Sequence, residues 1–221
     1  MSGAREEILA RIASALSDVP AGEVLPPVGR DYRRGDARPR PELVALLAQR
    51  LGDYGAVVRR VHAAEVSRAV ERECERLGLR RLVGPPGLPT PWRPASVELV
   101  ADDGLSARAL DAIDGALTGC ATAIAETGTL VLDGGPLSGR RLLTLVPDHH
   151  ICVVGAEQVV GQVPEAIAQV ASAVRERRAP VTLISGASAT SDIELSRVEG
   201  VHGPRHLVVL VVDDDQRAPP A

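Results

Sequence analysis

The feature that most constrains the fold of this chain is the alternation of short apolar runs with amphipathic segments, which begins near residue 41. The runs at 181–185 (VTLIS) and 206–213 (HLVVLVVD) are nearly continuous in apolar residues. Such runs are typical of strands covered on both faces, as in parallel sheets with helices on each side. Strands that alternate with helices indicate the same architecture. The sequence therefore predicts an α/β fold with a mainly parallel sheet flanked by helices.

The spacing of apolar residues, together with the positions of Gly and Pro, predicts the individual elements. Helices are expected at 3–17, 41–52, 63–77, 105–117 and 163–178. The segment 120–133 carries apolar residues suited to two strands, with a bend at 126–128. The other strands are expected at 56–61, 81–84, 97–102, 142–147, 151–155, 181–185 and 206–213, the last two with both faces covered.

A proline-rich stretch lies between the first helix and the regular part of the chain. It contains several arginines and the prolines Pro20, Pro26, Pro27, Pro39 and Pro41. Proline lacks a backbone N–H and clashes within a helix, so this stretch does not hold a regular element. We expect a helix and a Pro/Arg-rich arm over 1–40, an α/β domain over 41–215 and a polar tail over 216–221.

The composition excludes several kinds of chemistry. The 221 residues include 25 basic and 29 acidic side chains, for a net charge of −4, and every basic residue is arginine. Without lysine there is no Schiff-base nucleophile, no anchor for pyridoxal phosphate and no P-loop lysine. One tryptophan, two tyrosines and no phenylalanine offer few surfaces for base stacking. The acidic net charge disfavours phosphate backbones, so no nucleic-acid partner is expected.

Cysteines and histidines give no cofactor motif. The three cysteines are far apart and form no C-x-x-C pair, which excludes a disulfide framework or a four-cysteine cluster within this chain. His202 and His206 have a spacing that suits a metal on a helix, but Gly203-Pro204 forbids a helix there. We expect no metal site and no cofactor held by this chain alone.

The sequence shows no targeting or membrane segment. No apolar run is close in length to the about 18 residues that a membrane span requires. The first residues also lack a secretory apolar region. A cytoplasmic protein without a membrane span is the expectation.

A polar segment, 185–194 (SGASATSDIE), follows the expected strand at 181–185, and we call it the serine-rich segment. We expect a strand-to-helix turn whose backbone amides and hydroxyls bind a carboxylate or phosphate. The alternative is a plain helix start, because Ser191-x-x-Glu194 is a capping box. The candidate ligand-binding residues here are Ser185, Gly186, Ser188, Thr190, Asp192 and Glu194.

Glu126 is a second candidate, because it lies inside an otherwise apolar strand pair. If buried, its pKa would rise and it could act as a base, an acid or a nucleophile. The alternative is a strand-edge glutamate paired with an arginine such as Arg141. Thr127 and Gly128 beside it are candidate ligand-binding residues. Arg141 itself could bind an acidic ligand bidentately, although a solvated strand start is equally ordinary.

Two histidine groups complete the candidates. His202 could lie at the rim of the same cleft as the serine-rich turn and move a proton, or it could simply be part of a tight turn. His149-His150 is expected to mark a loop before the strand at 151–155. We expect Glu126, Ser188 and His202 to converge on one cleft near the carboxyl ends of the strands, with Glu126 and His202 as the candidate catalytic residues.

Four motifs in this order resemble the signature of the LUD domain, a family associated with lactate utilization. They are 123–132 (AIAETGTLVL), 141–154 with HHICVV, 184–194 (ISGASATSDIE) and 201–204 (VHGP). The resemblance is densest over 120–213 and extends from about residue 41. Within the family, the short single-domain form is the most similar.

This resemblance implies a fold similar to the sugar-phosphate isomerase and CoA-transferase superfamily. It also implies a role in the oxidation of L-lactate to pyruvate, alongside separate iron–sulfur partner proteins. The first hypothesis is thus a non-redox subunit that binds a small anionic ligand. The second is a free-standing enzyme that acts on a small carboxylate or phosphorylated metabolite through Glu126 and His202. A homo-oligomer and a cofactor shared with a partner stay open.

Overall fold

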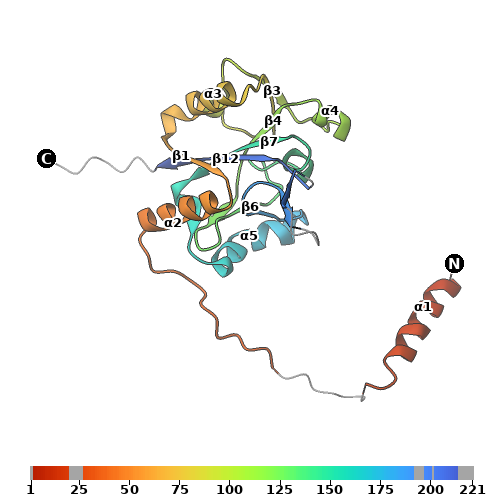
Figure 1. Cartoon of the computed structure of the whole chain (residues 1–221). Coiled ribbons are helices and arrows are strands. Elements are labelled where there is room, and N and C mark those ends of the chain that lie inside the picture. Colours follow the sequence, from red (N-terminus) through yellow and green to blue (C-terminus); the bar gives the residue numbers. More distant parts are fainter. Residues whose placement is uncertain (1, 20–26, 192–196, 201, 214–221) are drawn as a thin grey trace. The chain divides into compact units, whose positions relative to one another are not determined.

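The computed structural model describes residues 2–19, 27–191, 197–200 and 202–213. The chain divides into two compact units, Met1–Tyr32 and Arg33–Ala221. The first unit contains helix α1 (Ser2–Ala15), which confirms the expected N-terminal helix. The second unit contains the other helices and all the strands, labelled in Figure 1 where there is room.

The larger sheet consists of six parallel strands in the spatial order β1-β12-β7-β4-β2-β3 (Figure 1). Strand β12 is buried along most of its length, as its continuous apolar run predicts, and β7 is buried to a similar extent. The prediction of an α/β fold with a mainly parallel sheet flanked by helices is confirmed. In spatial order the strands are Val57–His62, His206–Asp213, His149–Gly155, Gly115–Gly119, Arg81–Gly84 and Glu98–Ala101.

A smaller sheet has four strands in the order β8-β5-β6-β9. Strands β5 and β6 form the antiparallel pair expected around the bend at 126–128, and β9 pairs with β6. The strands are Val159–Val160, Thr122–Ile124, Thr129–Leu132 and Thr182–Ile184. We expected β9 to be covered on both faces, which is wrong: it is the last strand of this sheet, and Leu183 is 54% exposed.

Three helices cover these sheets in layers. Helix α3 (Val66–Leu77) packs on one face of the larger sheet, α2 (Arg40–Asp53) lies between the two sheets, and α5 (Val163–Arg177) packs on the smaller sheet. In the described part of the chain, no helix is long and apolar enough to cross a membrane. The shorter helices are α4 (Ala107–Asp111) and the 3-10 turns Ala63–Glu65, Thr90–Trp92, Arg141–Thr144 and Ala156–Gln158.

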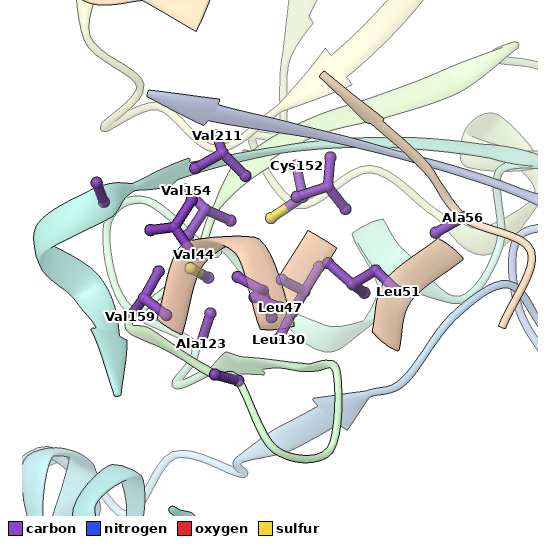
Figure 2. Packing of buried hydrophobic residues seen from close by; sticks show 14 of the residues in the cluster. Val44, Leu47, Leu51, Ala56, Ala123, Leu130, Cys152, Val154, Val159 and Val211 are labelled. Carbon is purple, nitrogen blue, oxygen red and sulfur yellow. The ribbon is translucent and has the colours of Figure 1, made fainter. Parts of the chain in front are cut away.

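Helix α2 contributes apolar side chains to the largest core cluster. Leu43, Val44, Leu47 and Leu51 recur at helical spacing and are buried. Figure 2 shows Val44, Leu47 and Leu51 between side chains of the larger sheet, such as Val154 and Val211, and side chains of the smaller sheet, such as Ala123 and Leu130. The helix is therefore the shared apolar layer of both sheets.

The proline-rich arm is anchored at Asp36. Its carboxylate accepts hydrogen bonds from the backbone N–H and guanidinium of Arg38 and from the Gln162 amide. These bonds, and above all those from Arg38, hold the pKa of Asp36 well below its usual range. A side chain at Gly161 would collide with Asp36, so the glycine allows this close approach. Residues 36–38 therefore pack on the end of β8.

Three expectations are wrong. The helix expected at 105–117 ends at Asp111, and β4 begins at Gly115 because that segment pairs with β7 and β2. The strand expected at 142–147 is instead a 3-10 turn, η3 (Arg141–Thr144), because its backbone N–H groups bond within the segment and Leu143 packs with Leu110 and Ile113. The helix start expected at Ser191 is the end of strand β10 (Ala189–Ser191), which pairs with β11 (Arg197–Glu199).

Removing the Leu47 side chain should destabilise the fold strongly. Leu47 is fully buried between the two sheets, so Leu47→Ala should lower the free energy of unfolding by about 2–5 kcal/mol. Urea unfolding followed by circular dichroism measures this loss. Ile167→Ala in α5 is the control, because Ile167 is 47% exposed. A loss at Leu47 no larger than at Ile167 would contradict the assignment of α2 as a shared layer.

Candidate functional site

A pocket of about 280 Å³ opens where strands β7 and β12 begin. We call this space the pocket and define it by its lining residues: Arg141, Thr144, Leu145, His150, the segment 182–189, the loop 202–204 and Leu207. Within the described residues, this lining includes one arginine, two histidines and several hydroxyls, but no Asp or Glu. Such a lining suits a small anion that also carries an uncharged polar group.

The position of the pocket differs from the expectation. We expected a cleft at the carboxyl ends of the strands, which is wrong for the larger sheet, because His150 and Leu207 lie near the amino ends of β7 and β12. The serine-rich segment follows β9 of the smaller sheet. The carboxyl end of β9 thus meets the amino ends of β7 and β12.

Ser188 and His202 are brought together as expected. Ser188 Oγ accepts a hydrogen bond from the backbone N–H of His202 at 3.1 Å, and the Ser188 N–H donates to the Pro204 carbonyl at 2.8 Å. The Ser188 carbonyl in turn accepts from the N–H of Gly200 at 2.9 Å. Ser188 thus binds the loop that carries His202, and both residues line the pocket.

Arg140 and Arg141 have separate surroundings. Arg140 makes a two-fold hydrogen bond to the buried carboxylate of Asp102, at 2.6 and 2.7 Å, which lowers the pKa of Asp102. Arg141 begins η3 and lines the pocket. Among the residues with a described structure, no carboxylate pairs with its guanidinium, which is therefore available to a ligand.

The bend at 126–128 is connected to the pocket through hydroxyls. Thr129 Oγ1 lies 2.7 Å from Thr127 Oγ1 and 2.8 Å from Ser185 Oγ, and Ser185 lines the pocket. Thr127 and Gly128 are not themselves part of the lining. Gly128 has φ of +60°, and a Cβ there would lie 2.6 Å from Arg50 Cβ of α2, so the backbone needs glycine at this point.

Glu126 is placed apart from the pocket lining. Its carboxylate accepts a hydrogen bond from the guanidinium of Arg33 at 2.7 Å, and 36% of its side chain is exposed. This contact is the arginine pairing weighed for Glu126 from the sequence, with Arg33 of the arm in place of Arg141. Glu126 therefore does not join Ser188 and His202 in the pocket.

The remaining candidates lie in or beside the serine-rich segment. Gly186 lines the pocket with φ of +93°, and a Cβ there would lie 2.5 Å from Tyr54 Cβ. Thr190 is in β10, with its backbone opposite Val198. Asp192 and Glu194 lie outside the described residues.

His150 is a pocket residue that the sequence analysis assigned to a loop and not to the site. It belongs to β7 rather than to a loop, and its side chain is buried with 1% exposed. Its Nε2 lies 2.8 Å from Thr118 Oγ1, while its Nδ1 has no hydrogen-bond partner among the residues that the structure describes. A buried polar atom without a partner costs about 1–3 kcal/mol. The signal in the sequence was a histidine directly before a continuous apolar run.

The other two histidines near the pocket interact with each other. His149 stacks on His206 with ring centroids 4.8 Å apart, and its Nδ1 lies 3.0 Å from the Asp114 carbonyl oxygen. In the part of the chain that the structure describes, no three His, Cys, Asp or Glu side chains gather as a metal site. All three cysteines are buried and free, and burial raises the pKa of Cys74 to about 12.

Burial of His150 should make the fold sensitive to acid. Burial lowers the pKa of His150 from its ordinary 6.5 to about 4, so between these values the unfolded chain binds a proton there that the native chain does not. Stability should therefore fall as the pH falls from about 6.5 to 4, by up to about 3 kcal/mol from this residue.

Urea unfolding at several pH values in this window measures the effect in the wild type and in His150→Gln. The variant lacks the titrating group, so its stability should fall less. The paired carboxylates of Asp36 and Asp102 are present in both proteins and cancel in the difference. His149→Gln is the control and should behave as the wild type. Equal slopes for the wild type and His150→Gln would contradict a neutral, buried His150.

Comparison with known proteins gives one consistent result. A sequence model of the LUD domain matches residues 96–212, a range that contains the whole pocket lining. Lactate utilization protein C of Deinococcus radiodurans is 50% identical over 175 residues, which cover 78% of this chain and 81% of that protein. Lactate utilization protein C of Shouchella clausii is 36% identical over 93 residues, which cover 41% of this chain and 40% of that protein.

A solved structure shows the same fold. The crystal structure of a DUF162 family protein from Deinococcus radiodurans matches with a TM-score of 0.69 and 40% sequence identity. The match covers 79% of this chain and 99% of that one.

Proposed function

Since this chain belongs to the LUD domain family, we propose that it takes part in lactate utilization as a non-redox subunit. The support is the 50% identity to a relative named lactate utilization protein C. We assign the electron transfer of L-lactate oxidation to separate iron–sulfur partner proteins, because the three cysteines of this sequence form no iron–sulfur motif. In this proposal the chain binds a small anionic ligand in the pocket.

The observation that carries the anion site is the guanidinium of Arg141. Arg141 lines a pocket whose other polar groups are hydroxyls, backbone amides and histidines, and no carboxylate among the described residues of the lining competes for it. With no lysine in the chain, arginine is the side chain that supplies permanent positive charge. Ser185 and Ser188 add hydroxyl donors on the facing segment.

The alternative of a free-standing enzyme that uses Glu126 and His202 has less support. Glu126 pairs with Arg33 and is not among the pocket residues, whereas His202 is. No described contact joins the two side chains. We therefore keep the anion-binding subunit as the proposed function.

Loss of Arg141 should weaken anion binding. A hydrogen bond to a charged group contributes about 1.5–3 kcal/mol, so Arg141→Ala should bind pyruvate or L-lactate at least about tenfold more weakly than the wild type. Isothermal titration calorimetry measures both affinities. Arg108→Ala is the matched control, because Arg108 is exposed in α4 and outside the pocket lining. Unchanged affinity in Arg141→Ala would contradict the anion site.

Omission of this chain should lower lactate oxidation by the assembled system. The assay is L-lactate-dependent reduction of a dye by the iron–sulfur partner proteins, with and without this chain. Co-purification of the chain with those proteins is the accompanying measurement. Equal dye reduction in both mixtures would show that the subunit role is wrong.

A further inference from the structure

A buried residue of the pocket lining carries a polar atom that has no hydrogen-bond partner among the described residues. His150 is 1% exposed and lines the pocket, and its Nδ1 makes no hydrogen bond within the part of the chain that the structure describes. Buried side-chain nitrogens in native proteins are nearly always hydrogen-bonded to protein or to a bound molecule. An unpartnered nitrogen beside a cavity therefore points to an atom of a ligand.

Thr118 determines which form of the His150 ring is present. Thr118 is fully buried in β4, and His150 Nε2 is the partner of its hydroxyl among the described residues. An unpaired hydroxyl hydrogen costs more than an unused lone pair, so the hydroxyl donates to Nε2. The hydrogen of the neutral imidazole then lies on Nδ1. A residue of the pocket lining therefore carries a buried N–H donor.

We propose that His150 is a ligand-binding residue whose Nδ1–H donates to the 2-oxo oxygen of a small 2-oxo carboxylic acid, while Arg141 binds the carboxylate. This inference rests on the proposed anion site and adds the chemical class of its ligand. A carbonyl oxygen only accepts hydrogen bonds and so matches an N–H donor. A phosphate would carry up to two negative charges into a lining with a single arginine.

Two substitutions separate the two nitrogens of the ring. The amide of Gln reaches the position of Nε2, and the shorter amide of Asn reaches the position of Nδ1. His150→Gln can keep the bond to Thr118 while it loses the donor to the ligand, whereas His150→Asn keeps a donor near Nδ1. Pyruvate should bind about tenfold more weakly to His150→Gln than to the wild type, and His150→Asn should lose less.

The probes are pyruvate, acetate and inorganic phosphate, each titrated into the full chain by calorimetry. Pyruvate should bind more tightly than acetate, which lacks the 2-oxo oxygen, and more tightly than phosphate. His149→Gln is the matched control, because His149 lies outside the pocket lining and stacks on His206. It should bind pyruvate as the wild type does.

Nitrogen-15 NMR of the histidine side chains tests the wild type without any substitution. The free protein should show His150 with the hydrogen on Nδ1, and pyruvate should shift that resonance while those of His149 stay in place. If pyruvate binds but neither the His150 resonance nor the affinity of His150→Gln changes, the role of His150 is wrong and the anion site stands. Equal affinity for pyruvate and acetate would overturn the 2-oxo assignment. If none of the probes binds, both the anion site and this inference fail.

Discussion

The burial of helix α2 between two sheets is the interaction on which the rest of the structure depends. Its leucines are the shared apolar layer of the six-stranded and four-stranded sheets. Two bends that contain glycine also pack closely against the end of the same helix. A Cβ at Gly128 would collide with Arg50, and a Cβ at Gly186 would collide with Tyr54. The core thus positions both loops of the smaller sheet that lead to the pocket.

This packing explains why the pocket lies at the amino ends of β7 and β12. The smaller sheet is stacked across α2, and its strand β9 ends beside the start of β7 and β12. His150, a polar residue near the start of β7, then lines the same pocket as the serine-rich segment instead of lying in the apolar core. Its unpartnered nitrogen is tolerated where a ligand can reach it.

Much of the candidate site could be predicted from the sequence. Which candidate residues line the pocket, and which pair with other parts of the chain, could not. Ser185, Gly186, Ser188, His202 and Arg141 line one pocket, whereas Glu126 is held by Arg33 of the arm. Adjacent arginines provide the clearest case, because Arg140 is used by the buried Asp102 while Arg141 faces the pocket. Residue type and spacing do not reveal a partner more than 30 positions away in the chain, because that contact forms only when the sheets pack.

The sequence by itself determined the α/β class, the order of most strands and helices, and the family motifs, because these follow from local periodicity and residue type. It also determined that any bound anion must meet arginine, hydroxyls, histidine or backbone amides, since the chain has no lysine. Only the tertiary structure decided that 142–147 is not a strand, that β10 replaces a helix start, and that His150 is buried beside the pocket. Each of these depends on which segments pair or pack together and on how deeply a side chain is buried. Both are decided by contacts between segments that are distant in the sequence.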